Sequence, residues 1–269
     1  MNRVDTRPIG IFDSGAGGLT VSSKIARLLP NEKIIYFGDT ARVPYGNKSR
    51  EAVTRFSKEI INFLLEFKVK LIIVACNTAS SLSLDSLKSS FRIPIIGVIE
   101  PGAEEALKAT KTFRIGVIGT EATISSNAYK KRIKSAGKRC FVIQKACPLF
   151  VSLVENKWLN DGITLRIAKR YLFPVLEKKI DTLILGCTHY PLLKNTIRKV
   201  TGKNVTLVDS SASVAKSVKR VLEKNGLSAD AGRGGVKFFV SDDTKNFAKL
   251  AKVFLKKNIT VKKHVFGIS

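Results

Sequence analysis

The sequence lacks the features that would assign it to several specialised classes of protein. Its 269 residues include only four cysteines and two histidines, and no cysteines are spaced as a CxxC pair. We therefore expect neither a metal site nor a disulfide framework. No apolar run reaches the roughly 18 residues that a transmembrane helix needs, and the segment MNRVDTRPIG has no apolar signal core. These absences predict a cytoplasmic protein with reduced thiols and no membrane association.

Acidic residues are also scarce. The 21 Asp and Glu residues are outnumbered by 47 Lys and Arg residues, which gives a formal net charge of +26. Such a charge is typical of nucleic-acid-binding proteins, and this class stays open as an alternative. The basic residues are spread along the whole chain, however, and the densest group, at 129–140, has no interleaved aromatic side chains for stacking on bases. We therefore expect no dedicated nucleic-acid binding.

Short apolar runs alternate with stretches of helical periodicity. In 51–67 and in 246–255, apolar residues recur every three or four positions, as on the buried face of a helix. Apolar runs predict nine strands, at 8–13, 33–39, 70–76, 94–100, 113–120, 140–146, 181–187, 204–210 and 236–242. This alternation predicts an α/β fold with mostly parallel sheets covered on both faces. Nine strands are many for one sheet, so two sheets that face a central cleft are expected.

Polar motifs follow five of these runs, and in α/β proteins ligands bind beyond the carboxyl ends of the strands. The five motifs are DSGAGG, GDTARVPYG, CNTAS, GTEAT and CTHYP. The first is not a dinucleotide fingerprint, because Thr20 occupies the position of the third glycine. Its backbone N–H groups could bind an anion, and Asp13 and Ser14 could orient or activate a neighbouring group. Taken alone, the motif favours a tight turn capped by Asp13.

Two cysteines occupy matched positions. Cys76 and Cys187 each follow an apolar strand and precede a candidate helix, where a thiol pKa of about 8.5 is expected to fall towards neutral. A Cys-His hydrolase would use Cys187 with His189 but would leave Cys76 idle, and a redox pair usually uses CxxC. Inversion of a stereocentre needs a base on one face of a carbon and an acid on the other. Two thiols on opposite walls of a cleft meet that requirement.

Five strings, in order and over nearly the whole chain, resemble the glutamate racemase family: DSGAGGLTV, YFGDTARVPYG, VACNTAS, GVIEPGA and LGCTHYPLL. The resemblance implies a cofactor-independent enzyme that interconverts L- and D-glutamate and supplies D-glutamate for peptidoglycan. It also implies two α/β domains, one formed by 1–97 plus 210–269 and the other by 98–209. The closest alternative is an aspartate racemase. The expected partner is the small-molecule substrate, and a homodimer is compatible with this interpretation.

The resemblance also implies roles for individual residues. Cys187 resembles the base that takes the α-proton of L-glutamate, and Cys76 the one that serves D-glutamate. Asp13 resembles the acid that supports Cys76, whereas His189 and Glu155 resemble the supporting pair on the Cys187 side. The substrate contacts implied by the resemblance are Asp13, Ser14, Tyr45, Gly46, Asn77, Thr78, Thr120, Thr123, Thr188 and His189. Because these strings contain almost no Lys or Arg, we expect neutral donors and helix N-termini to bind the substrate carboxylates.

Overall fold

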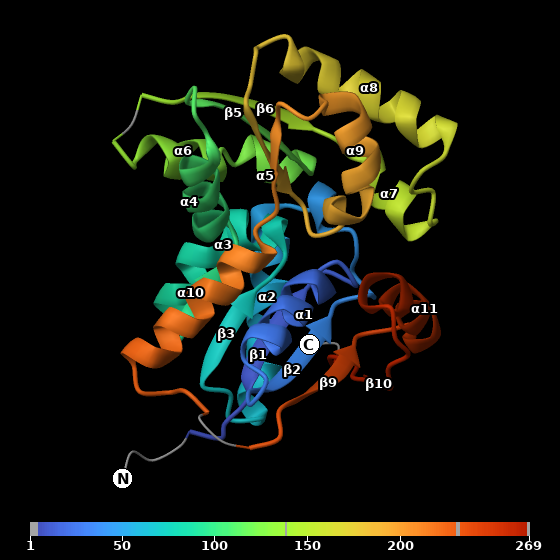
Figure 1. Ribbon diagram of the computed structural model, residues 1–269. Coiled ribbons are helices and arrows are strands. Elements are labelled where there is room, and N and C mark those ends of the chain that lie inside the picture. Colours follow the sequence, from blue (N-terminus) through green and yellow to red (C-terminus); the bar gives the residue numbers. More distant parts are fainter. Residues whose placement is uncertain (1–4, 138, 230–231, 268–269) are drawn as a thin grey trace.

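The structure, a computed structural model, describes residues 5–137, 139–229 and 232–267. Within these ranges ten strands form two separate sheets, one of six strands and one of four. Every pair of neighbouring strands is parallel. Figure 1 shows the four-stranded sheet and its helices above the six-stranded sheet. The predicted α/β fold with two parallel sheets is confirmed.

The six-stranded sheet has the order β10-β9-β2-β1-β3-β4. Its strands are β1 (Ile9–Asp13), β2 (Lys33–Gly38), β3 (Leu71–Val74), β4 (Ile95–Gly97), β9 (Gly235–Val240) and β10 (Val261–Lys263). Successive side chains of a strand point to opposite faces. Ile9 and Ile11 therefore pack with the helices of one face and Phe12 with those of the other. Apolar residues on both faces explain why these strands read as continuous apolar runs.

Five helices cover this sheet. On one face lie α1 (Leu19–Leu28), α10 (Ser211–Lys224) and α11 (Thr244–Leu255), and on the other lie α2 (Arg50–Glu66) and α3 (Asn77–Ser90). Ser49 caps α2 by accepting a hydrogen bond from the N–H of Ala52. We call this sheet with its helices the first lobe.

The four-stranded sheet, with the order β6-β5-β7-β8, forms the second lobe together with its helices. Its strands are β5 (Arg114–Gly119), β6 (Phe141–Ala146), β7 (Thr182–Gly186) and β8 (Thr206–Val208). Its helices are α4 (Ile99–Ala109), α5 (Glu121–Ser125), α6 (Ala128–Lys134), α7 (Leu149–Glu155), α8 (Gly162–Leu176) and α9 (Lys194–Thr201). Val117 packs with α4 and α6, whereas its neighbour Ile118 packs with α7 and α8. No helix among the described residues is long and apolar enough to cross a membrane.

Two details of the predicted strands are wrong. The strand expected at 94–100 ends at Gly97, and α4 begins at Ile99. A short apolar run does not distinguish a buried strand from the buried first turn of a helix. The tenth strand, β10, was not predicted, because its sequence is Val-Lys-Lys and has no apolar run.

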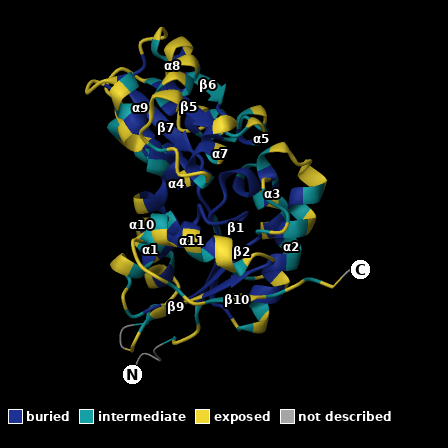
Figure 2. Cartoon of the chain, turned by 90° about the vertical axis from the view of Figure 1, so that its right-hand side faces the viewer, coloured by how far each residue is buried: buried dark blue, intermediate teal, exposed yellow. Residues whose placement is uncertain are grey.

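The chain passes between the lobes twice, after β4 and after β8. Asp13, the last residue of β1, contacts Thr188, which follows β7, so the carboxyl ends of these strands meet at the junction of the lobes. Many of the segments at this junction are buried (Figure 2). The predicted domains, 1–97 plus 210–269 and 98–209, stay a prediction. It is supported by the strands, because β1–β4, β9 and β10 form one sheet and β5–β8 form the other.

A buried ion pair lies at the amino ends of the strands of the first sheet, away from the junction. The Lys70 side chain, just before β3, is fully buried, and its Nζ lies 2.7 Å from Glu32 Oε2. The same ammonium donates to the carbonyl oxygens of Asp5 and Leu227 at 2.8 and 2.6 Å. Lys70 therefore joins three segments that are distant in sequence.

We expect Lys70→Met to destabilise the protein strongly, because it leaves the Glu32 carboxylate buried without its cation. The loss should be roughly 3–5 kcal/mol of unfolding free energy. Urea unfolding monitored by circular dichroism measures it. The control is Lys219→Met, which breaks a half-exposed 3.7 Å pair with Glu223 and should cost about 1 kcal/mol or less. Equal losses in the two variants would contradict this account.

Candidate active site

The Cys76 thiol lies where β3 passes into α3. Cys76 occupies the N-cap position of α3 and is 5% exposed. Its sulfur lies 3.7 Å from the hydroxyl of Ser14, which follows β1. Because β1 and β3 are neighbours in the sheet, the two loops that follow them lie side by side. The predicted strand-to-helix position of Cys76 is therefore observed.

The expectation of an acidic Cys76 thiol is wrong. Burial, and next the nearby Asp13 carboxylate, raise the pKa of Cys76 to about 12. The N–H of Ala79 in the first turn of α3 and the Ser14 hydroxyl act in the opposite direction but do not outweigh these two effects. A helix N-terminus stabilises a thiolate by less than desolvation and an adjacent anion destabilise it. Cys76 is therefore a protonated thiol.

The Cys187 thiol occupies the corresponding place in the second lobe. It directly follows β7 and is 7% exposed. Its sulfur lies 3.9 Å from Nδ1 of His189, and Nε2 of the same ring lies 3.3 Å from Oε1 of Glu155, the last residue of α7. An α-helix was expected directly after Cys187, but a short 3₁₀ helix, η2 (Tyr190–Leu193), follows instead. The next α-helix, α9, begins at Lys194.

Interactions of the His189 ring favour its charged form. Burial opposes the imidazolium, but the contacts with Cys187 and Glu155, together with the Asp13 carboxylate, outweigh it and raise the pKa of His189 to about 10. The Cys187 sulfur therefore has a cationic neighbour, whereas Cys76 has an anionic one. The two thiols are chemically unequal.

Asp13 connects the two lobes. It ends β1, is fully buried, and accepts hydrogen bonds from the Gly15 N–H at 3.0 Å and from the Thr188 hydroxyl of the second lobe at 3.3 Å. Burial raises its pKa, and the positive charge of His189 acts against that rise. A carboxylate of the first lobe and an imidazolium of the second thus influence each other across the junction.

A glycine allows this close approach. A Cβ atom at Gly17 would lie 2.2 Å from the Thr188 hydroxyl and 2.7 Å from His189 Nδ1, which is shorter than any real contact of this kind. The loop after β1 therefore lies directly against the loop after β7 only because residue 17 has no side chain. The motif DSGAGG is a contact surface between the lobes as well as a turn.

Three threonine hydroxyls form a second contact between the lobes. Thr78 of α3 lies 2.9 Å from Thr120 and 3.4 Å from Thr123, and the latter two hydroxyls are 2.9 Å apart. Thr120 also caps α5 by accepting from the Thr123 N–H. These predicted contact residues, contributed by both lobes, are brought together by the fold.

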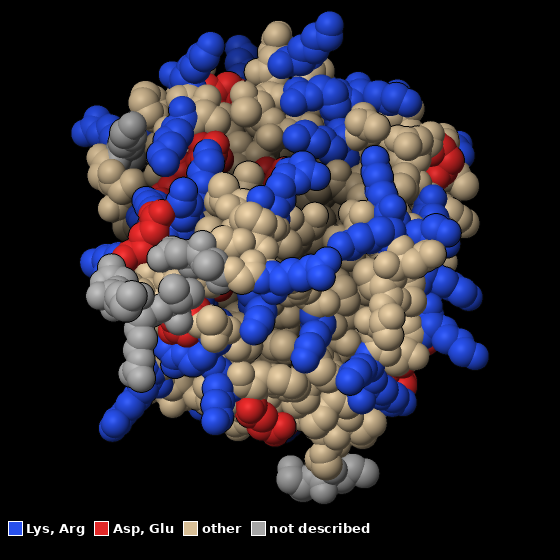
Figure 3. Space-filling view, turned by 60° about the horizontal axis from the view of Figure 1, so that its bottom comes forward, with Lys and Arg blue, Asp and Glu red and all other residues tan. Residues whose placement is uncertain are grey.

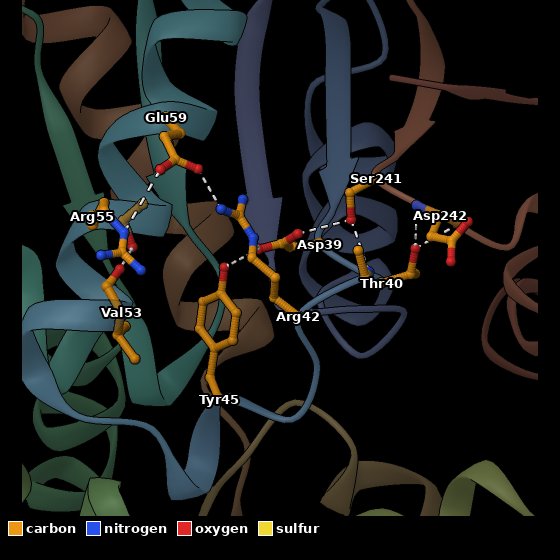
Figure 4. Close-up of polar contacts among 11 residues, drawn as sticks. Asp39, Thr40, Arg42, Tyr45, Val53, Arg55, Glu59, Ser241 and Asp242 are labelled. Carbon is orange, nitrogen blue, oxygen red and sulfur yellow. Dashed lines mark hydrogen bonds and ion pairs between the residues drawn. The ribbon is translucent and has the colours of Figure 1, made fainter. Parts of the chain in front are cut away.

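The loop of Tyr45 and Gly46 reaches the same threonines. A Cβ atom at Gly46 would lie 2.8 Å from that of Thr120. The Tyr45 hydroxyl, however, donates to Asp39, which Arg42 also contacts at 2.7 Å (Figure 4). The hydroxyl proton of Tyr45 is therefore engaged within the first lobe.

Asn77 has a partner that the sequence did not suggest. Its Oδ1 accepts a 2.7 Å hydrogen bond from the hydroxyl of Tyr129, a buried residue of α6. Tyr129 stands in a run of basic residues with no recognisable motif, so no local signal identifies it. The Glu155 side chain, by contrast, is 34% exposed and lies at the edge of the site.

Comparisons with known proteins agree with this geometry. Residues 9–218 match the family model described as Asp/Glu/Hydantoin racemase. The chain belongs to this family.

Several similar proteins are named as glutamate racemases. The chain is 49% identical over 250 residues to that of Geobacter metallireducens, which covers 93% of each chain. The crystal structure of a glutamate racemase isoform from Bacillus anthracis has a TM-score of 0.94 at 42% identity and covers 97% of this chain and 98% of that one. The Francisella tularensis enzyme, solved in complex with D-glutamate, has a TM-score of 0.91 at 38% identity, with 98% of each chain covered. The predicted resemblance is confirmed.

We expect Gly17→Ala to abolish most of the racemase activity, because a methyl group at this position pushes Thr188 and His189 away from Asp13. Displacements of this size cost about 100-fold in kcat/KM. Gly15→Ala is the matched control, since a Cβ atom there would have Val43 as its nearest neighbour at 3.7 Å. Steady-state kinetics of both variants test this, and a loss of similar size in Gly15→Ala would contradict it.

The raised pKa of His189 predicts a pH-dependent contribution to stability. The unfolded ring titrates near 6.5 and the folded ring near 10, so its stabilising contribution is fully present below about pH 6.5 and is lost as the pH rises towards 10. The difference in unfolding free energy between wild type and His189→Gln should shrink over this interval. Urea titrations from about pH 6 to about pH 10 measure it. A difference that does not change with pH would contradict the assignment.

Proposed function

We propose that the protein is a cofactor-independent glutamate racemase that transfers protons between Cα and two thiols. The relatives that are 38–49% identical over nearly the whole chain are named as glutamate racemases. An archaeal aspartate racemase homologue, from Pyrococcus horikoshii, is only 19% identical with a TM-score of 0.58, which indicates a shared fold alone. Glutamate is therefore favoured over aspartate as the substrate.

One observation carries the mechanism: the two thiols have opposite electrostatic surroundings. The Cys187 sulfur lies 3.9 Å from the His189 ring, which carries a positive charge, and Cys76 is a protonated thiol beside Asp13. For L-glutamate, the Cys187 thiolate takes the α-proton and becomes a thiol. The carbanion then takes the proton of the Cys76 thiol on its opposite face, and Cys76 becomes a thiolate. The reverse reaction uses the same two groups in exchanged roles.

Neutral donors would bind the substrate carboxylates. The first N–H groups of α3, at Asn77 and Thr78, have no partner within the helix and form an anion site at its N-terminus. The side chains of Ser14, Thr78 and Thr188 add hydroxyl groups in the same region, and all three are buried. Removal of the α-proton increases the negative charge next to the α-carboxylate, and fixed donors in a buried site stabilise this charge.

Deuterium incorporation tests the two-thiol reaction. In D₂O the wild type should convert L-glutamate to D-glutamate that carries deuterium at Cα, while unconverted L-glutamate stays protiated early in the reaction. Cys76→Ala and Cys187→Ala should each lose racemisation by about 1,000-fold or more. Cys76→Ala should still exchange the α-proton of L-glutamate alone, and Cys187→Ala that of D-glutamate alone.

The matched control is Cys140→Ala, because Cys140 lies just before β6 and outside the proposed machinery. Its activity should equal that of the wild type. Equal labelling of substrate and product from the start would contradict two separate acid/bases. Activity on aspartate with none on glutamate would establish the aspartate racemase alternative.

The cellular part of the proposal follows from the reaction. D-glutamate is a component of peptidoglycan, so we place the enzyme in the cytoplasm, where the precursor is made, and assign it no cofactor. We also propose a homodimer, which the half-exposed apolar side chains of Leu149, Trp158 and Phe173 on the second lobe support.

The alternative of nucleic-acid binding has less support. On the face drawn in Figure 3, Lys and Arg side chains are spread over the surface and do not gather in one stripe. A dedicated interface concentrates them along a groove or helix. We therefore propose no dedicated nucleic-acid function, and salt-dependent gel shifts with duplex DNA distinguish the two cases.

A further inference from the structure

Tyr129 is fixed in place by tight packing. It lies on α6, is 1% exposed, and belongs to the core of the second lobe. A Cβ atom at Gly102 of α4 would lie 3.2 Å from its ring, and one at Gly186, the last residue of β7, would lie 3.1 Å from the other edge. Two glycines thus make room for the ring, and its hydroxyl is directed out of the lobe to Asn77.

The acceptor of this hydroxyl distinguishes Tyr129 from Tyr36 and Tyr190, and it differs from the acceptor of Tyr45, Asp39, in belonging to the opposite lobe. The hydroxyl groups of Tyr36 and Tyr190 donate to the backbone carbonyl oxygens of Gly15 and Cys147, which the chain itself already holds in place. Tyr129 donates instead to the side chain of Asn77, which adjoins Cys76 and belongs to the opposite lobe. A side-chain amide needs such a partner to define its orientation.

An asparagine amide can be placed in two ways that differ by half a turn. One exposes the oxygen and the other exposes the NH₂ group. With Oδ1 bound to the Tyr129 hydroxyl, the Nδ2 donors point away from Tyr129. Burial, and next the charge of Cys187, raise the pKa of Tyr129, so the hydroxyl keeps its proton and remains a donor.

We propose that Tyr129 is a positioning residue that fixes the Asn77 amide with its NH₂ group towards the bound amino acid. The inference rests on the proposed function, because it gives the NH₂ group a substrate carboxylate as its acceptor. Tyr129 does not touch the substrate. It makes Asn77 a permanent donor next to Cys76, so that substrate binding does not have to order the amide.

A double-mutant cycle of Tyr129→Phe and Asn77→Ala tests the inference in the full-length protein. Tyr129→Phe keeps the ring and its packing and removes only the hydroxyl. We expect it to lower kcat/KM for glutamate by about tenfold, mainly through a higher KM. In the Asn77→Ala background the same change should have an effect of no more than about twofold, since the amide that it orients is gone. Calorimetric dissociation constants for D-glutamate give the same cycle where turnover is too slow to assay.

Thr110→Val is the matched control for the loss of a buried hydroxyl. The Thr110 hydroxyl donates to Asp181 at 2.6 Å. Asp181 directly precedes β7, so this hydrogen bond lies at the amino ends of the strands, away from the site. Its loss should lower the melting temperature as Tyr129→Phe does but leave kcat/KM unchanged.

Two outcomes would overturn the inference. One is unchanged kcat/KM in Tyr129→Phe, and the other is an equal loss with and without Asn77, which would make the role of Tyr129 structural only. A wild type that does not racemise glutamate would instead contradict the proposed function, so the two failures are distinguishable.

Discussion

The buried carboxylate of Asp13 is the group on which the rest of the site depends. It is fully buried, it holds its own turn through Gly15, and it accepts a hydrogen bond from Thr188 of the other lobe. Its charge helps to keep Cys76 protonated and His189 charged. A single carboxyl group at the end of β1 therefore acts on Cys76 in its own lobe and on His189, the neighbour of Cys187, in the other lobe.

The contact between the lobes depends on side chains that are small or absent. Gly17 lies against Thr188 and His189, and Gly46 lies against Thr120, at distances that allow no Cβ atom. Short hydroxyl side chains fill the remaining space. Asp13, Thr188 and His189 are all buried at this junction, and burial strengthens the electrostatic effects between them. Burial is also the main cause of the raised pKa of Cys76.

Stability and chemistry are separated along the strands. The amino ends of the strands, away from the junction, carry groups that hold segments together. These are Lys70 with Glu32 in the first lobe and Asp181 with Thr110 in the second. The carboxyl ends carry Asp13, Cys76 and Cys187. In a parallel sheet all the carboxyl ends of the strands lie on the same side. Functional residues from distant parts of the chain can therefore lie close together there.

The sequence by itself determined the α/β fold, nine of the strands and the matched positions of Cys76 and Cys187, because apolar runs and the polar residues that end them are local patterns. It did not determine the partner of Asn77, the engagement of the Tyr45 hydroxyl by Asp39, or the protonation of Cys76. Each of these depends on groups that are far apart in the chain and on the exclusion of water at the junction. Local sequence predicts a helix N-terminus that favours a thiolate, and only the tertiary structure adds the burial and the neighbouring carboxylate that reverse this effect.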